Sequence, residues 1–168
     1  MTDNMSLDED LARIALQEKT LQFERFDAKT AWEIGTRLKA LAEERRVAVA
    51  IDITVSGRTI FYYALQGTTP DNTEWVRRKK NVVQRFFRSS YGLGLTLERS
   101  QTTLAAQQGL DLRDFATHGG SFPINLAGTG CIGSITVSGL PQRQDHAYVV
   151  EVLANYLGHP LEDLALGQ

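Results

Sequence analysis

The sequence predicts an α+β protein, an α/β sandwich in which helices pack on a mostly antiparallel sheet. Two observations carry this prediction. Segments with the 3.6-residue period of amphipathic helices alternate with short β-branched runs, in the rough order ααββα(α)ββα. The β-branched runs are joined by short turns that suit hairpins, whereas a parallel sheet needs long crossovers, so a doubly wound parallel sheet is disfavoured.

The first half of the chain is predicted to form two helices and a hairpin. Apolar residues recur at helical spacing from Leu7 to Ala15, and Asp27 suits the N-cap of a second helix that runs to about Arg46. Residues 47–55 and 59–65 are expected to form two antiparallel strands around Ser56-Gly57-Arg58. The expected buried stripe of the second helix is Ala31, Trp32, Gly35, Leu38 and Leu41.

The second half is predicted to contain a helix over residues 71–90 and a weaker helical stretch over 98–108. A strand over 134–138 and a last helix from Pro141 to Gly158 follow. Glycines 128, 130 and 133 spell the dinucleotide motif G-x-G-x-x-G. That motif must open a helix, whereas these glycines lead into a strand, so we reject a nucleotide site here.

Composition restricts the class of protein. A chain of 168 residues with 42% hydrophobic and 23% charged residues fits one domain spanning residues 1–168. The net charge of −2 offers no bulk attraction to nucleic acid or to a membrane, and neither is expected as a partner. The acidic N-terminus lacks signal-peptide features, no apolar run could span a membrane, and the single Cys131 excludes an intrachain disulfide. We therefore expect a soluble, cytoplasmic protein.

The predicted helix over 71–90 carries an unusual lysine. Lys79 falls within the apolar arc of the helix, with Asn72 on the same stripe two turns earlier. A buried ammonium needs an anionic partner from the protein or from a ligand, unless the side chain extends along the surface to water. Asn72 is either a pocket residue or a helix cap. The apolar arc itself consists of Trp75, Val76, Val82, Val83, Phe86 and Phe87.

Other chemical signals are weak. The chain has no G-x-S-x-G elbow, no H-E-x-x-H pair and no P-loop, so no catalytic residue is assigned and no metal-ion site is predicted. Cys131 is expected to be a small buried hydrophobe rather than a nucleophile. Adjacent helical residues such as Asp145 and His146 point apart. The arginines of the 71–90 helix are expected to face solvent or another subunit: Arg77, Arg78, Arg85 and Arg88.

Three separated motifs resemble one known family. They are residues 75–79 (WVRRK) with 82–91, residues 118–124 (HGGSFPI), and residues 133–140 (GSITVSGL) with Gln144-Asp145-His146. Together they resemble the haem-degrading domain family, in particular its branch in the cytoplasm of bacteria and fungi, and the similarity covers the chain from the first helix to Gly158. The family includes GlcG-type proteins, a secreted haem-binding sensor component and a haem-binding domain attached to some cobalamin adenosyltransferases. The resemblance implies an α/β sandwich and a homo-oligomer.

The resemblance also implies a ligand-binding site and haem as its cofactor. Haem-binding relatives often carry alanine and threonine after the matching lysine, where this chain has residues 80–83 (KNVV). The iron ligand varies among relatives, which leaves His118 and His146 as the chemically obvious candidates, although each histidine also fits a structural role. The matching site residues are Asn72, Trp75, Arg78, Lys79, His118, Gly119, Gly120, Phe122, Pro123, Gln144, Asp145 and His146.

Two functional hypotheses follow. In the first, the protein binds a small molecule or tetrapyrrole and has the capacity for haem degradation, with anionic groups of the ligand near Lys79, Arg78 and the backbone amides of the 118–123 turn. Trp75 or Phe122 would stack on the ring. In the second, the protein is an oligomeric scaffold or adaptor without small-molecule chemistry.

Overall fold

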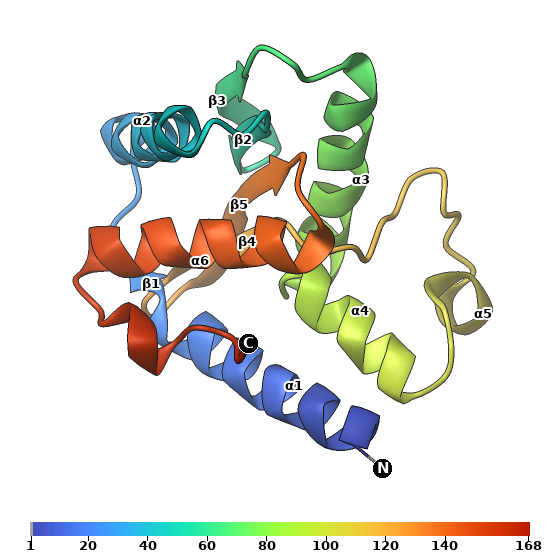
Figure 1. Cartoon of the computed structure of the whole chain (residues 1–168). Helices are drawn as coiled ribbons and strands as arrows, with labels where there is room; N and C mark the ends of the chain where they lie inside the picture. Colours follow the sequence, from blue (N-terminus) through green and yellow to red (C-terminus); the bar gives the residue numbers. More distant parts are fainter. Residues whose placement is uncertain (1) are drawn as a thin grey trace.

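A five-stranded mixed sheet forms the centre of the protein, in a computed structural model that describes residues 2–168, with side chains from residue 5 onward. The strand order is β1-β4-β5-β2-β3, and every neighbouring pair is antiparallel except β1 with β4 (Figure 1). The predicted α+β class and the mostly antiparallel sheet are confirmed. The strands are β1 (Gln22–Phe23), β2 (Ala50–Val55), β3 (Arg58–Ala64), β4 (Ser121–Leu126) and β5 (Gly130–Ser138).

Six α-helices surround this sheet in the described residues, and a short 3₁₀ turn, η1 (Leu161–Asp163), follows the last one. Asp27 caps the second helix as predicted, since its carboxylate accepts the N–H of Thr30 at 2.9 Å. The last helix ends at Gly158 in the left-handed conformation, again as predicted. The helices are α1 (Thr2–Thr20), α2 (Ala28–Arg45), α3 (Pro70–Phe86), α4 (Ser90–Arg99), α5 (Leu104–Gln108) and α6 (Gln142–Leu157).

The two faces of the sheet differ in chemistry, because alternate residues of a strand point to opposite faces. One face is apolar and packs against α2 and α6. Its side chains are fully buried with those of the two helices in the main core. This apolar face consists of Ile51, Ile53, Phe122, Ile124, Ile135 and Val137.

The opposite face is polar although it is also buried, and α3 covers it. Lys80 of α3 reaches this face and donates to Asp52 at 3.2 Å and to Thr54 at 3.3 Å. The α3 layer is therefore held partly by charges and hydroxyls. The polar face consists of Asp52, Thr54, Ser121, Ser134, Thr136 and Ser138.

Two residues predicted to be buried are exposed. Trp32 is 65% exposed because it lies on the side of α2 next to the edge strand β3, where its ring contacts Phe61 at a centroid distance of 6.0 Å. Phe87 leaves the apolar arc because α3 ends at Phe86 and Phe87 adopts the left-handed conformation of a C-cap (φ 57°). The predicted stripe of α2 was thus wrong at Trp32, and that of α3 at Phe87.

The predicted helical stretch over 98–108 was correct at its end, where Gly109 caps a helix over residues 104–108, but wrong in its first half. Glu98 and Arg99 are instead the last residues of α4, a helix that the sequence pattern did not indicate. Ser89 caps this helix, since its hydroxyl accepts the N–H of Gly92 at 3.1 Å. A separate short helix, α5, begins after Thr103. None of the helices in the described residues is both long and apolar enough to cross a membrane.

Candidate functional site

A pocket of about 240 Å³ opens where the first turns of α3 and α6 approach each other. It combines residues from α3, from the turn before β4, from the end of β5 and from α6, so four separated parts of the chain meet there. The residues that line it are Asp71, Asn72, Trp75, Lys79, His118, Ser138, Gly139, Leu140, Gln142 and Asp145.

The α3 wall of the pocket follows from helical spacing. Asn72, Trp75 and Lys79 are three and four residues apart, which places them on one side of the helix. Asn72 also caps the helix, because its side-chain oxygen accepts the backbone N–H of Thr69 at 2.9 Å. Both roles considered for Asn72 are therefore combined in one residue.

A buried ion pair forms the floor. The Lys79 ammonium lies 3.0 Å from the carboxylate of Asp145, and the two side chains are 3% and 1% exposed. It also donates to Ser138 Oγ at 3.3 Å and to the carbonyl of Val137 at 3.4 Å. The expected anionic partner of Lys79 is thus supplied by the protein itself, and the alternative in which the side chain extends to water is wrong.

The Asp145 carboxylate is held from a second side. It accepts the backbone N–H of Leu140 at 2.9 Å and that of Gly139 at 3.3 Å. Burial lowers the pKa of Lys79 and raises the pKa of Asp145, while their mutual attraction opposes both shifts. The two groups together make five hydrogen bonds, one of them to each other. We therefore assign the charged form to both groups at neutral pH.

The turn before β4 passes close to this ion pair because it contains two glycines. A β-carbon on Gly120, whose φ is +138°, would lie 2.2 Å from the carbonyl oxygen of Val137 and 2.9 Å from Lys79 Nζ. A β-carbon on Gly119 would lie 2.3 Å from the carbonyl oxygen of Gln142, and the Gly119 N–H donates to the Gln142 side chain at 3.2 Å. The turn is therefore fixed between α3 and α6.

His118, at the start of the same turn, forms the outer wall of the pocket with Trp75. The two rings meet edge to face with centroids 4.9 Å apart. Partial burial lowers the pKa of His118, and the charges of Lys79 and Arg78 lower it further. The imidazole is consequently neutral at pH 7 and retains an unprotonated ring nitrogen.

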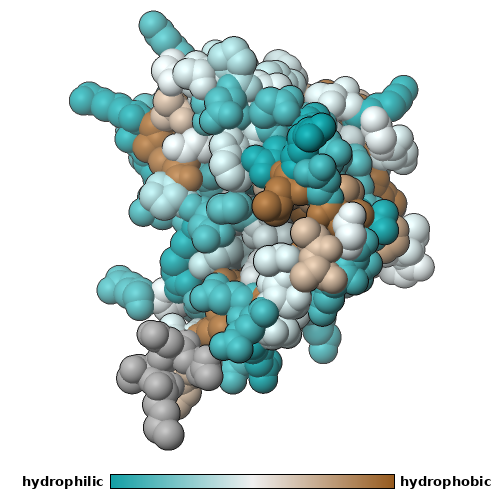
Figure 2. Space-filling view, turned by 90° about the vertical axis from the view of Figure 1, so that its right-hand side faces the viewer, coloured by the Kyte–Doolittle hydropathy of each residue, from teal (hydrophilic) through white to brown (hydrophobic). Residues whose placement is uncertain are grey.

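The arginines of α3 have a structural function that the sequence did not reveal. Arg77 donates to the carbonyl of Arg113 at 2.9 Å and forms an ion pair with Asp114 at 3.0 Å. Arg78 donates to the carbonyl of Leu112 at 2.9 Å, and its guanidinium lies over Trp75, 4.6 Å from the ring centroid. These contacts attach the segment before His118 to α3, in the region seen in Figure 2, where hydrophobic patches alternate with hydrophilic side chains.

Seven of the twelve residues carried over by resemblance do not line the pocket. Arg78, Gly119 and Gly120 lie beside lining residues. The other four lie elsewhere. Phe122 lies in the core on the apolar face of the sheet, Pro123 is buried on the opposite face, and Gln144 is exposed. His146 is completely buried and shares a 2.7 Å hydrogen bond with Gln17 of α1. Burial lowers the pKa of His146 to about 3. A ring-stacking role for Phe122 and an iron-ligand role for His146 do not fit these positions.

Sequence reasoning missed several lining residues, of which Gln142 is the most informative. It precedes Asp145 by three residues, so it lies on the same side of α6, and this spacing was the signal that could have found it. Ser138, Gly139 and Leu140 belong to a motif that the resemblance contained, but they were not assigned to the site.

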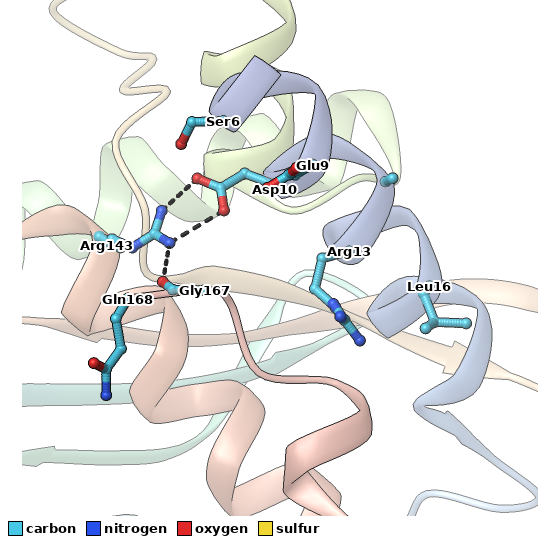
Figure 3. A pocket seen from close by; sticks show the side chains of 9 residues that line it. Ser6, Glu9, Asp10, Arg13, Leu16, Arg143, Gly167 and Gln168 are labelled. Atoms are coloured by element: carbon cyan, nitrogen blue, oxygen red, sulfur yellow. Dashed lines mark hydrogen bonds and ion pairs between the residues drawn. The ribbon is translucent and has the colours of Figure 1, made fainter. Parts of the chain in front are cut away.

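A second cavity, of about 420 Å³, lies between α1, the first turn of α6 and the C-terminal segment (Figure 3). Its charged side chains connect these elements to one another. Arg143 forms an ion pair with Asp10 of α1 and donates to the carbonyl of Gly167 at 2.5 Å. No residue predicted for the site lies here, so we assign these contacts to holding α1 and the C-terminal segment together.

Cys131 does not have the surroundings of a nucleophile. Its thiol is half-buried and donates to the carbonyl of Gly133 at 3.4 Å, and burial raises its pKa. Within residues 2–168, no group of three or more histidine, cysteine, aspartate or glutamate side chains is placed to hold a metal ion.

Comparison with known proteins identifies the family. A family model described as "Haem degrading protein HbpS-like" matches residues 26–154. The chain belongs to this family. Two relatives of the chain are UPF0303 proteins: that of Azotobacter vinelandii is 58% identical over 162 residues, 96% of this chain and 98% of the relative. That of Serratia proteamaculans is 53% identical over 154 residues, 92% of this chain and 96% of the relative.

Solved structures agree with this assignment of the fold. The crystal structure of the Ybr137w protein superposes with a TM-score of 0.82 at 28% identity, covering 88% of this chain and 87% of the other. HbpS superposes with a TM-score of 0.63 at 21% identity, covering 82% and 94%. A complex of PduOC with haem gives a TM-score of 0.62 at 18% identity, covering 73% and 89%. At these last two identities the likeness concerns the fold.

Proposed function

We propose that the protein binds haem or a related tetrapyrrole at the pocket between α3, the 118–120 turn and α6. Membership of the HbpS-like haem-degrading family supports this ligand class. The observation that carries the location is the 4.9 Å contact between Trp75 and His118, because it joins the two separated parts of the site that the family resemblance implied. Haem, when bound, would supply iron for oxygen chemistry.

The residues present fit one edge of such a ligand. The His118 ring contacts Trp75 edge to face, and its depressed pKa leaves a neutral nitrogen for iron. Lys79 is neutralised by Asp145, whereas Arg78 forms no ion pair with any described residue, so the guanidinium beside Trp75 is the better partner for a propionate.

The size of the pocket restricts how such a ligand would sit. Ligand-binding pockets usually measure about 300–1,000 Å³, and this one measures about 240 Å³ within one chain. One chain would therefore enclose an edge of the tetrapyrrole and leave the remainder outside. The larger side chains of residues 80–83, which replace the alanine and threonine of haem-binding relatives, do not line this pocket.

Titration with haem tests the proposal. Wild-type protein at micromolar concentration should shift the Soret band of haem, and His118→Ala and Arg78→Gln should weaken the shift. His159→Ala is the matched control, since His159 follows the opposite end of α6. The absence of any Soret shift with the wild type would overturn the proposal. Titration in air with ascorbate then separates binding from degradation, because only degradation bleaches the Soret band progressively.

A second candidate function is an oligomeric scaffold without small-molecule chemistry. The observation in its favour is the group of exposed aromatic side chains beside β3, described below. Native mass spectrometry of protein purified without added ligand discriminates the two functions. A retained small molecule favours the binding protein, whereas an oligomer without one favours the scaffold.

A further inference from the structure

Within residues 2–168, the strand β3 forms one edge of the sheet and is hydrogen-bonded to a neighbour, β2, on one side only. The other edge strand, β1, has only two residues. A long unpaired edge is a template for pairing with another chain, and proteins usually blunt it with proline, lysine or inward-pointing charges. β3 has seven residues with the sequence RTIFYYA, so it contains none of these after Arg58.

One feature that disfavours edge pairing, a β-bulge, is present but lies early in the strand. The register between β2 and β3 shifts between Ile53 and Thr54, which leaves Ile60 as an extra residue on β3. From Phe61 to Ala64 the pairing is regular. The stretch with an ordinary unpaired edge is therefore also the stretch that carries three consecutive aromatic residues, Phe61, Tyr62 and Tyr63.

Aromatic side chains are exposed on both sides of this edge. Trp32 is 65% exposed on α2 and contacts Phe61, while Tyr62 and Tyr63 are 41% and 39% exposed. Figure 1 shows β3 between α2 and α3. Tyr62 bonds to Thr73 of α3 at 2.7 Å, whereas Tyr63 lies beneath Lys39 of α2. Exposed tryptophan and tyrosine are the residues enriched in the energetic centres of interfaces.

The size of this surface suits a dimer. A tryptophan or tyrosine presents about 150–250 Å², so the exposed fractions of Trp32, Tyr62 and Tyr63 correspond to about 200–350 Å². A stable interface buries about 800 Å² on each partner. Three side chains thus supply roughly a third of that area, and the strand edge and the adjoining surface of α2 are available for the rest.

The charges near the surface favour a second copy of the same chain. Lys39, which lies over the Tyr63 ring, is paired with Glu43 on α2, so this lysine adds no unpaired charge to the surface. A strongly charged face would repel its own copy, and a charged peptide would require an opposite charge here. An antiparallel edge is also complementary to itself, because a two-fold axis matches its free N–H groups with the free carbonyls of the other copy.

We propose that two copies of this chain associate about a two-fold axis through antiparallel pairing of their β3 strands. The pairing joins two five-stranded sheets into one of ten strands. It also brings Trp32 of each copy against the aromatic surface of the other. The proposal concerns an interface and holds whether or not the pocket binds haem.

Sedimentation velocity at micromolar concentration, with Trp32→Glu and Tyr63→Glu, tests the proposal. The wild-type protein should sediment as this dimer of the 18.7 kDa chain, or as a larger assembly that contains the dimer. Each variant should raise the dissociation constant about tenfold or more. Leu112→Glu is the matched control, because Leu112 is an exposed apolar residue on the segment attached to the other side of α3. Both substituted side chains are exposed, and a cooperative melting curve verifies that each variant folds.

Hydrogen exchange supplies a second measurement that needs no variant. The outward-facing amides of Phe61 to Ala64 should exchange more slowly as the protein concentration rises through the dissociation constant. A wild-type monomer at micromolar concentration would overturn the proposal. The proposal would also be overturned if neither Trp32→Glu nor Tyr63→Glu dissociated the assembly and the exchange rate of the β3 amides did not depend on protein concentration.

Discussion

Replacing Lys79 by methionine should destabilise the protein strongly. The substitution keeps most of the side-chain volume but leaves the Asp145 carboxylate, 1% exposed, without its cation. Breaking a buried ion pair by removing one partner costs about 3–5 kcal/mol. The N–H groups of Gly139 and Leu140 still hold the carboxylate, so we expect the lower part of that range, about 3 kcal/mol. Urea unfolding at pH 7 measures the loss directly.

Two further variants make this measurement decisive. Lys39→Met removes a lysine from an exposed pair with Glu43 and should cost no more than about 1 kcal/mol. Combining Lys79→Met with Asp145→Asn removes the unpaired charge while keeping an acceptor for the backbone, and should recover about half of the loss. If Lys79→Met lost less than about 1 kcal/mol, the ion pair could not be the floor that this structure describes.

Three other predictions concern the surroundings of the site. The pKa of His146 is lowered from 6.5 to about 3, so between these pH values the unfolded chain takes up a proton at His146 and the folded chain does not. The free energy of unfolding should therefore fall by about 2 kcal/mol between pH 7 and pH 5. His146→Leu should remove this part of the pH dependence. Gly120→Ala should cost at least about 2 kcal/mol in urea unfolding, whereas Gly128→Ala, where nothing lies within 4 Å of the added β-carbon, should cost less. Arg78→Ala should accelerate hydrogen exchange in the segment before His118 without affecting α6. An unchanged exchange rate would show that Arg78 does not attach this segment to α3.

The sequence predicted what depends on local spacing. The period of residues 71–90 placed Lys79 inside an apolar arc, from which the need for an anionic partner followed. The identity of that partner was not accessible from spacing, since Asp145 lies 66 residues away and only the fold brings the two together. The family resemblance had included both residues in the site without pairing them.

The errors have equally local causes. Helix α4 escaped notice because Gly92 and Gly94 lower its helix propensity, and its leucines are buried on more than one side, which removes the amphipathic period. Trp32 was assigned to the core because its spacing fits the stripe of α2, but that stripe extends past the edge of the sheet. Gln144 was chosen in place of Gln142 because a motif match does not indicate which side of a helix faces a pocket.

The contrast between the two faces of the sheet has a consequence for folding and motion. The layer containing α2 and α6 buries the continuous apolar face, whereas α3 lies on hydroxyls, an aspartate and two lysine ion pairs. Since the burial of apolar area is the dominant source of stability, α3 should detach from the sheet at a lower free energy than global unfolding requires. Its amides should therefore exchange before those of α6. The pocket is built partly on α3, so occupancy of the pocket and the opening of α3 should be thermodynamically linked.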